Sequence, residues 1–385
     1  MSDINNLFDS SDKRYMRSAL ALAEKNIGMA GPNPSVGCLI VHDGKIVGKG
    51  WHEYDQMDHA EVRALKMAGD KSVGSTVYVT LEPCCHQGRT PPCTDLLIQQ
   101  RVRRVVVACI DPNPKVSGRG IARLRSNGIL VDIGLMSDSA GRIIESFACS
   151  MNTGRPFVIA KVGMSLDGKI GTGWKAGRRI TSQAGRDYAH SLRLRSDALL
   201  VGIGTILSDD PFLTYRGSAK RRKPLLRVIL DSELRTPADA RIFQDIKHSP
   251  VLIFCKRSTA AGRRKKLEDR GADIVAVPKS RKVLDPEVIL SELAAREVQG
   301  LLVEGGSRVH WEFISRQLVD RFDFIIAPMV LGGEYAIPSI GGKGYTATAD
   351  APRFKIRRSF YTGPDLVLEG YPVYSRSIIS PWLLP

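Results

Sequence analysis

Apolar and polar segments alternate along the whole chain and predict a protein of mixed helices and strands. In the first 150 residues, amphipathic stretches with helical spacing lie between short apolar runs typical of strands. His42-Asp43-Gly44 separates two of these runs, and its Asp-Gly pair is typical of a hairpin turn. The expected helices lie near 11–27, 59–68, 94–100 and 118–127, and the expected strands in SVGCLIV, KIVGKGW, TVYVTLEP and RRVVVACI. This order predicts a three-layer α/β domain.

The pattern begins again after a turn in MNTGRPFVIAKVG, and we place a domain boundary there. The expected domains are residues 1–152 and 153–385. Strands of the second domain are expected in DALLVGIG, LLRVILDS, VLIFC, ADIVAVP and GLLVEGG, with helical segments between them. Because these runs are apolar nearly throughout, they predict a parallel or mixed sheet that is covered on both faces.

The net charge of +16 is spread unevenly along the 385 residues. Residues 1–150 hold 18 Lys and Arg against 16 Asp and Glu, which leaves 38 against 24 for the remainder. A net positive charge is typical of nucleic-acid-binding proteins. The excess of Lys and Arg lies away from the cysteine-rich segment of the first domain, however. Phosphorylated small molecules explain local positive charge equally well, and part of the excess, as in KRRK at 220–223, fits a solvated surface. We therefore expect no nucleic-acid partner.

No apolar run approaches the ~20 residues that span a bilayer, and the segment MSDINNLFDSSDKR lacks the apolar stretch of a signal peptide. We expect a cytoplasmic protein with no membrane partner. The chain has seven cysteines, an odd number that favours reduced thiols over a disulfide framework. Cys38, Cys109 and Cys255 sit in apolar runs and are expected in the core.

Two segments of the first domain together match the start of the zinc nucleobase deaminase signature. His59 and Glu61 open a predicted helix, and Pro83-Cys84 ends a predicted strand. His59, Cys84 and Cys93 would supply one imidazole and two thiolates, which leaves a fourth position on zinc open for water. Glu61 would not be a ligand and would carry a proton from that water to the departing ammonia. The sequence therefore predicts a catalytic zinc site.

The spacing of the two cysteine ligands departs from that signature. Deaminases of cytidine and of adenosine in transfer RNA have Cys-x-x-Cys, whereas Cys93 follows Cys84 by nine residues. His86 and Arg89 lie between them and would face the substrate. The alternatives are unrelated thiols or a closed structural zinc site, whose fourth ligand would come from His86, Cys85 or His52.

The motifs GPNPSVGCLIV, HAEVRAL, LEPCCHQGRTPPC and DPNPKVSGRG together resemble the deaminase domain of the bifunctional riboflavin-biosynthesis deaminase–reductases. The resemblance implies that Asn33 and His52 contact a pyrimidine and that His86 and Arg89 help to bind the substrate. From the residues alone, Asn33 fits a turn between prolines and His52 fits a strand end equally well. Two departures are visible: Cys85 stands where the family often has Ser, and the glycine common just before the zinc histidine is lacking.

The resemblance continues to the end of the chain. KVGMSLDGKIG, DALLVGIGTILSDDPFLTYR, RVILDSELRTP and LVDRFDFIIAPMVLGG are similar to the family's reductase domain, which has a dihydrofolate-reductase-like fold. LLVEGGSRVHWEFI predicts a strand, two glycines and a helix, and the helix N-terminus would offer free N–H groups to an anion. An ordinary strand-to-helix turn has the same pattern. The Gly-x-Gly-x-x-Gly of a Rossmann fold is absent from the sequence.

For the second domain, the resemblance implies that NADPH reduces the ribosyl group of the deaminated product to a ribityl chain. The positions that match the family's NADPH contacts are Gly163, Thr205, Asp209, Gly305, Gly306 and Ser307, and those that match its substrate contacts are Arg193, Leu213, Arg216 and Glu304. Gly177 and Arg179 replace a family serine that binds substrate and a tryptophan beside the cofactor. We expect Arg179 to reach the 2′-phosphate of NADPH.

The sequence thus predicts a two-domain enzyme that uses Zn²⁺ and NADPH. The first step is hydrolytic deamination of 2,5-diamino-6-ribosylamino-4(3H)-pyrimidinone 5′-phosphate, and the second is reduction of the ribosyl group of 5-amino-6-ribosylaminouracil 5′-phosphate. Two alternatives stay open: a single-function zinc deaminase with a non-catalytic C-terminal domain, and a basic RNA-binding or RNA-editing deaminase. We expect a homo-oligomer that acts on a phosphorylated pyrimidine.

Overall fold

The chain divides into two compact units, with the division between Gly154 and Arg155. The computed structural model describes residues 7–54, 56–88, 90–173, 179–280 and 283–374. Gly177 and Arg89, two of the expected substrate residues, lie outside the described residues. None of the described helices is long and apolar enough to cross a membrane.

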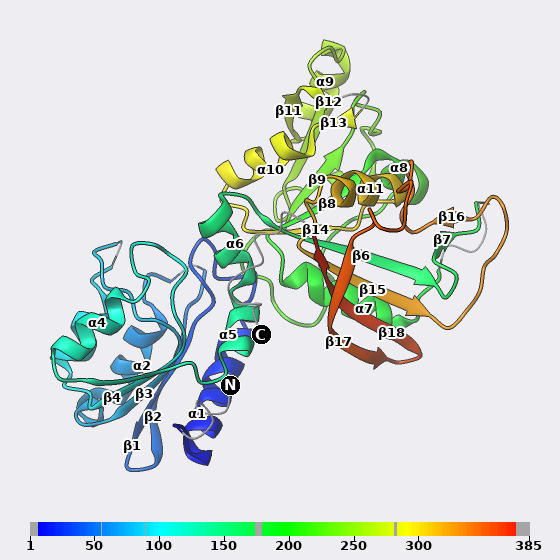
Figure 1. The fold of residues 1–385 in the computed structure, drawn as a ribbon. Helices are drawn as coiled ribbons and strands as arrows, with labels where there is room; N and C mark the ends of the chain where they lie inside the picture. The colour runs from blue at the N-terminus through cyan, green and yellow to red at the C-terminus, as the bar shows by residue number, and fades with distance from the viewer. Residues whose placement is uncertain (1–6, 55, 89, 174–178, 281–282, 375–385) are drawn as a thin grey trace. The chain divides into compact units, whose positions relative to one another are not determined.

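The N-terminal unit is built on a five-stranded sheet in the order β2-β1-β3-β4-β5 (Figure 1). Strand β1 is antiparallel to both its neighbours, whereas β3, β4 and β5 run parallel. The strands are β1 (Gly37–His42), β2 (Lys45–Trp51), β3 (Thr76–Leu81), β4 (Arg104–Cys109) and β5 (Leu130–Ile133). The helices are α1 (Ser10–Glu24), α2 (Ala60–Ala68), η2 (Gly69–Ser72), α3 (Cys93–Gln99), α4 (Arg119–Ser126), α5 (Ser137–Ile143) and α6 (Glu145–Thr153).

Glycines in β2 allow helix α2 to pack directly on this strand. A Cβ atom at Gly50 would lie 1.9 Å from the carbonyl oxygen of Ala60, and one at Gly48 would lie 2.2 Å from that of Ala64. The close packing fixes the first turn of α2, which begins directly after His59. The β1–β2 hairpin turn has positive φ at Asp43 (47°) and Gly44 (71°), as its Asp-Gly pair predicted.

The C-terminal unit is built on a nine-stranded sheet in the order β11-β10-β9-β8-β14-β6-β15-β18-β17. All pairs from β11 to β15 are parallel, and the β17–β18 hairpin adds two antiparallel strands. The strands of this sheet are β6 (Phe157–Ser165), β8 (Ala198–Gly202), β9 (Leu226–Leu230), β10 (Val251–Lys256), β11 (Asp273–Val277), β14 (Gly300–Val303), β15 (Arg321–Ala327), β17 (Arg353–Thr362) and β18 (Asp365–Val373).

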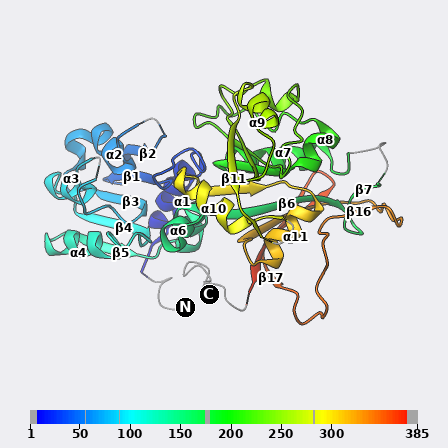
Figure 2. The same ribbon diagram turned by 90° about the horizontal axis from the view of Figure 1, so that it is seen from above.

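Helices cover both faces of the C-terminal sheet: α7 and α8 lie on one side of β6 and α11 lies on the other (Figure 2). The helices are α7 (Gln183–Leu194), α8 (Ile203–Asp209), η3 (Arg241–Phe243), α9 (Ala261–Glu268), α10 (Pro286–Ala295) and α11 (Ser307–Ser315). Two small ribbons, β7 (Lys169–Gly171) with β16 (Ile337–Pro338) and β12 (Lys279–Ser280) with β13 (Val283–Leu284), complete the unit.

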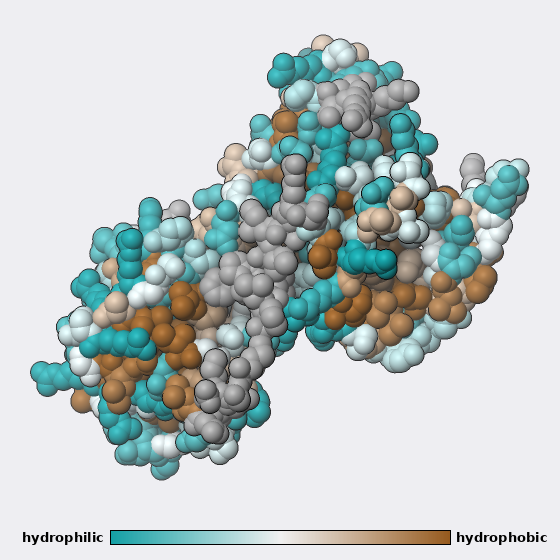
Figure 3. Space-filling view, in the orientation of Figure 1, coloured by the Kyte–Doolittle hydropathy of each residue, from teal (hydrophilic) through white to brown (hydrophobic). Residues whose placement is uncertain are grey.

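The helices and strands predicted from the hydrophobic pattern are all present, and Cys38, Cys109 and Cys255 are buried as predicted. The pattern did not predict β5, α5, α6, β15 or the β17–β18 hairpin. Strand β17 is an edge strand with exposed apolar side chains, among them Tyr361 at 74% and Ile356 at 48% exposure. Figure 3 shows apolar surface on this side of the C-terminal unit.

Candidate active sites

Three potential zinc ligands meet in the N-terminal unit. The Nδ1 atom of His59 lies 3.6 Å from the Sγ atom of Cys84 and 3.3 Å from that of Cys93. All three ligand atoms lie within 4.8 Å of one another. Tetrahedral zinc with ordinary Zn–N and Zn–S bonds needs such atoms about 3.5 Å apart. The donor types and their spacing therefore fit one zinc ion.

Each of the three residues comes from a different element, and local structure fixes each one. His59 is the N-cap residue of α2, and Cys93 is the first residue of α3. Cys84 follows β3 and is held from α3, because the Cys93 N–H donates to its Sγ (3.3 Å) and the Thr94 N–H donates to its carbonyl oxygen (3.1 Å). The nine-residue spacing thus spans a loop between a strand end and a helix start.

Glu61 lies in the first turn of α2, beside this cluster, and is only 4% exposed. Burial, followed by the Cys84 thiolate, raises the pKa of its carboxyl to about 7. Its side chain is within hydrogen-bonding reach of Cys93. A carboxyl group that exchanges a proton near neutral pH suits the acid–base role expected from the sequence.

Asn33 and His52 form a pair next to the cluster. The Asn33 Nδ2 atom lies 3.0 Å from His52 Nε2, and His52 Nδ1 lies 3.2 Å from the carbonyl oxygen of Asp58. The rings of His52 and His59 meet edge to face with centroids 5.7 Å apart. If the backbone oxygen fixes the proton on Nδ1, then Nε2 accepts from the Asn33 amide, which leaves the Asn33 carbonyl oxygen for another donor.

None of the three alternative fourth ligands joins the cluster in the described part of the chain, where the metal-ligating group consists of His59, Cys84 and Cys93. The Cys85 thiol instead lies 3.9 Å from the carbonyl oxygen of Lys115. The Nδ1 atom of His86 is buried and has no hydrogen-bond partner. Three protein ligands with a free fourth position are typical of a catalytic rather than a structural zinc site.

In the C-terminal unit, the carboxylate of Glu304 forms a buried ion pair with Arg193. The Nε and Nη2 atoms of Arg193 each donate to one of its oxygens at 2.7 Å, and Lys161 Nζ lies 3.5 Å from it. Burial raises the pKa of Glu304, but the charges of Arg193 and Lys161 outweigh it and bring the pKa to about 2. Glu304 follows β14, Arg193 lies in the last turn of α7 and Lys161 lies in β6, so three elements converge here.

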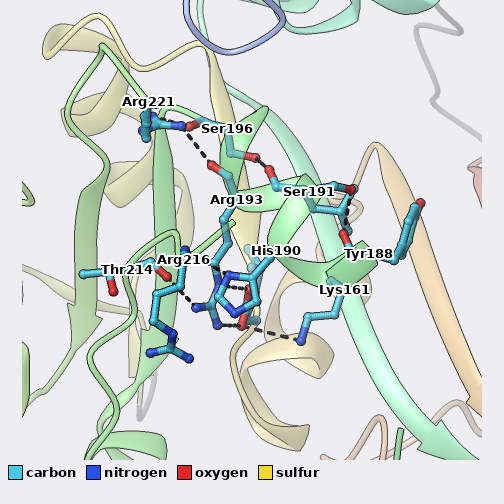
Figure 4. Close-up of polar contacts among 12 residues, drawn as sticks. Lys161, Tyr188, His190, Ser191, Arg193, Ser196, Thr214, Arg216 and Arg221 are labelled. Carbon is cyan, nitrogen blue, oxygen red and sulfur yellow. Dashed lines mark hydrogen bonds and ion pairs between the residues drawn. The ribbon is translucent and has the colours of Figure 1, made fainter. Parts of the chain in front are cut away.

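Residues 213–216 pass close to this ion pair. The Nη1 atom of Arg193 donates to the Thr214 carbonyl oxygen at 2.9 Å, and the Arg216 N–H donates to His190 Nδ1 at 3.4 Å (Figure 4). Leu213 is buried and has a positive φ of 53°, a strained backbone conformation for a leucine. The structure thus groups Arg193, Glu304 and the segment of Leu213 and Arg216, all expected at the substrate.

A cavity of about 240 Å³ opens beside Glu304. Its lining includes the expected cofactor residues Gly163, Arg179 and Gly306, together with Lys161 and Glu304. Arg179 is exposed and reaches this cavity from the segment that follows the undescribed residues 174–178.

The remaining expected cofactor residues surround the N-terminus of α11. Gly306 is the N-cap residue, with φ of 81°, and Ser307 begins the helix with a buried hydroxyl that has no hydrogen-bond partner. Thr205 Oγ1 would lie 4.0 Å from a Cβ atom at Gly306, and Gly305 packs on Val309. Asp209 is exposed at the end of α8, accepts from Ser208 Oγ (2.9 Å) and is not among the residues that line the cavity in this structure.

Lys161 is a charged residue of this site that the sequence did not identify. It contacts Glu304 and lines the cavity. The available signal is a lysine inside the otherwise apolar run FVIAKVGM, because a charged residue in a covered strand needs a partner.

Comparisons with known proteins identify the families of both domains. The family model for the cytidine and deoxycytidylate deaminase zinc-binding region matches residues 9–109, and that for the RibD C-terminal domain matches residues 156–368. Fold and site therefore define a zinc-binding deaminase joined to a reductase. The riboflavin biosynthesis protein RibD of Aquifex aeolicus is 40% identical over 357 residues, which cover 93% of this chain and 97% of that protein. The chain belongs to the RibD family of bifunctional riboflavin-biosynthesis enzymes.

Solved structures give the same result. RibD of Acinetobacter baumannii (form 1) is 32% identical with a TM-score of 0.82, and the match covers 94% of this chain and 99% of that one. A diaminohydroxyphosphoribosylaminopyrimidine deaminase/5-amino-6-(5-phosphoribosylamino)uracil reductase of Thermotoga maritima is 32% identical with a TM-score of 0.81 and the same coverage. The predicted α/β fold class, the deaminase and reductase activities and the cofactors zinc and NADPH are thereby confirmed.

Proposed function

We propose that His59, Cys84 and Cys93 hold the zinc ion of the deaminase and that Glu61 is its proton carrier. When bound, zinc supplies a hydroxide near neutral pH by lowering the pKa of a water molecule. Glu61 takes up the proton of that water and delivers it to the amino group that leaves as ammonia. The observation that carries the proposal is the three-ligand cluster with a buried carboxyl beside it.

The proposed substrate of this site is 2,5-diamino-6-ribosylamino-4(3H)-pyrimidinone 5′-phosphate. Asn33 and His52 bind its pyrimidine ring, and His86 and Arg89 bind it from the zinc loop. The hydrogen bond between Asn33 and His52 supports the first part, because it orients the Asn33 carbonyl oxygen as an acceptor. The buried, unpartnered Nδ1 atom of the partly exposed His86 supports the second, since such an atom needs a partner from a ligand or water.

In the reductase domain, residues 153–385, we assign the substrate to the Glu304 side of the cavity and NADPH to the α11 side. NADPH supplies the hydride that converts the ribosyl group of 5-amino-6-ribosylaminouracil 5′-phosphate to ribityl. Arg193, Leu213, Arg216 and Glu304 bind and orient the substrate, and we also assign Gly177 to the substrate from its place in the sequence. Gly163, Thr205, Asp209, Gly305, Gly306 and Ser307 bind the cofactor, and Arg179 contacts its 2′-phosphate. The free N–H groups at the α11 N-terminus support the cofactor assignment.

The test of the deaminase assignment is an assay of the whole protein with the diamino substrate, zinc and NADPH. Ammonia release and the loss of NADPH absorbance are followed together. Glu61→Ala is expected to slow ammonia release by roughly 10²- to 10⁴-fold while zinc stays bound, because only the proton carrier is lost. The exposed Glu24 of α1 gives a matched control, Glu24→Ala. Normal ammonia release by zinc-loaded Glu61→Ala would contradict the assignment.

We further infer a cytoplasmic homo-oligomer that binds neither nucleic acid nor membranes. The exposed apolar side chains of edge strand β17 support contact with a second copy of the chain. Part of the basic run at 220–223 is engaged inside the fold, since Lys223 pairs with Asp197 at 2.6 Å, which supports the absence of a nucleic-acid role. Sedimentation velocity and RNA filter binding with a salt series test the two inferences.

A further inference from the structure

Glu82 is a buried acid that neither proposed site uses. It directly precedes Pro83-Cys84 and is 3% exposed. Its Oε2 atom accepts from the N–H groups of Asp111 (3.2 Å) and Gly118 (2.8 Å), and its Oε1 atom accepts from the Ile121 N–H (3.2 Å). In the described part of the chain its charge is therefore met by three backbone N–H groups, without an ion pair.

Two of these N–H groups belong to the beginning of helix α4. The N-cap residue of α4 is Gly118, at φ of 85°, so the helix has no capping side chain of its own. Ile121 is the third residue of α4, whose N–H a capping side chain ordinarily binds. Glu82 supplies this acceptor from the end of β3, and its negative charge also suits the positive end of the helix dipole. The Glu82 side chain therefore caps the N-terminus of α4, although Glu82 itself follows strand β3.

The contact lies directly against the metal cluster. A Cβ atom at Gly120 would be 2.2 Å from the carbonyl oxygen of Pro83, so the first turn of α4 rests on the peptide that leads to Cys84. Lys115 lies over Cys85, with its carbonyl oxygen 3.9 Å from the thiol. Burial raises the pKa of Asp111 to about 6, and the nearby charges of Glu82 and, to a smaller extent, Cys84 add to this rise. Residues 111–118 and the first turn of α4 therefore form a wall against Pro83 and Cys85, the two neighbours of the ligand Cys84.

We propose that Glu82 is a positioning residue of the deaminase, which holds the 111–118 segment and α4 against the zinc loop and so sets the shape of the substrate pocket. The inference rests on the proposed function of His59, Cys84 and Cys93. Loss of the carboxylate releases the wall but leaves the ligands in place, because Cys84 is held separately by the N–H groups of Cys93 and Thr94. Substrate binding then weakens more than the chemical step.

The test is Glu82→Gln in the zinc-loaded full-length protein. Glutamine keeps the shape of the side chain but turns its amide NH2, a donor, toward at least one of these N–H donors. The KM for deamination is expected to rise about tenfold, the effect of one lost charge-assisted hydrogen bond, with a smaller change in kcat. Zinc content and the kinetics of reduction of the supplied intermediate stay unchanged.

The matched control is Asp12→Asn, a change in another buried carboxylate of the same unit. Asp12 accepts from Tyr78 Oη (2.7 Å) and from Arg104 (2.8 Å), and it makes no contact with the 111–118 segment in the described residues. This variant is expected to lose stability while the KM for deamination stays unchanged. An equal rise of KM in both variants would mean that Glu82 only stabilises the fold, and it would overturn the proposal.

The reactivity of Cys85 gives a second measurement that does not depend on turnover. Its half-buried thiol lies under Lys115, so release of the wall in Glu82→Gln is expected to speed alkylation by iodoacetamide several-fold, measured on the Cys85 peptide by mass spectrometry. Unchanged labelling together with an unchanged KM overturns the proposal. Because labelling needs no substrate, it still tests Glu82 if the wild-type protein releases no ammonia, a result that would defeat the proposed function instead.

Gly120→Ala disrupts the contact between α4 and the zinc loop from the α4 side. It serves as the test if Glu82→Gln does not fold. The added methyl group must move away from the Pro83 carbonyl oxygen, so the same rises in KM and in Cys85 labelling are expected. A folded Gly120→Ala protein with wild-type values of both contradicts the proposal.

Discussion

At the scale of single residues, the reductase pocket depends on one buried carboxylate. Glu304 is held between Arg193 and Lys161, and none of these three side chains is exposed by more than 17%. Removal of one partner from such a group leaves buried charge uncompensated, which costs far more than the intact pair contributes. The two cations therefore keep the carboxyl group of Glu304 ionised before any substrate binds.

We expect Glu304→Gln to destabilise the C-terminal unit by about 3 kcal/mol, because it leaves the buried Arg193 without a counter-charge. Urea unfolding at neutral pH measures the change. The difference from wild type should shrink as the pH falls from about 4.5 to about 2, since the lowered pKa of Glu304 gives a stabilisation that is lost only when the carboxylate protonates. A difference that stays constant over this range would contradict the expectation.

The sequence identified residue types well and their pairings poorly. His59, Cys84 and Cys93 were predictable because zinc chemistry restricts ligands to few residue types. The partnership of Glu304 with Lys161 was not, because the two residues are far apart in the chain and only the strand order of the sheet brings them together.

At the scale of elements, helix α7 contains Arg193 in its last turn, and the side chain of Arg221 caps its C-terminus. The Nη atoms of Arg221 donate to the carbonyl oxygens of Arg193, Leu194 and Ser196 at 2.7–2.9 Å. These oxygens lie at the C-terminus of the helix, where a cation also suits the dipole. Arg221 belongs to KRRK, and a surface role was one interpretation of this run. A one-dimensional pattern cannot distinguish a solvated arginine from a helix cap.

Arg221→Gln is expected to destabilise the C-terminal unit by about 2 kcal/mol, because it removes charge-assisted hydrogen bonds from three carbonyl groups. Because Arg193 lies at this helix end, the reductase rate should fall while ammonia release does not. Thermal unfolding and the two activity assays measure these effects. Arg222→Gln, which removes the same charge from an exposed neighbour, is the control. An equal effect of both changes would assign the loss to net charge.

At the scale of the whole molecule, the proposed zinc ligands all lie in the N-terminal unit and the Glu304 pocket lies in the C-terminal unit. The hydrophobic pattern predicted most strands of both sheets because these strands are short apolar runs bounded by turns. The β17–β18 hairpin escaped prediction because its first strand is largely exposed and mixes charged with apolar residues.

Removal of zinc with a chelator is therefore expected to abolish ammonia release and to leave NADPH-dependent reduction of the supplied deaminated intermediate intact. Re-addition of zinc should restore the first activity. Parallel loss of both activities on chelation would contradict the separation of the two sites.

The division between Gly154 and Arg155 lies within one continuous chain, and this has a consequence for the cell. Each round of translation yields one deaminating and one reducing catalyst, so their numbers stay equal whatever the level of expression. The reductase is therefore always present in the same amount as the deaminase. The cell does not need to coordinate two genes to prevent the deaminated intermediate from accumulating.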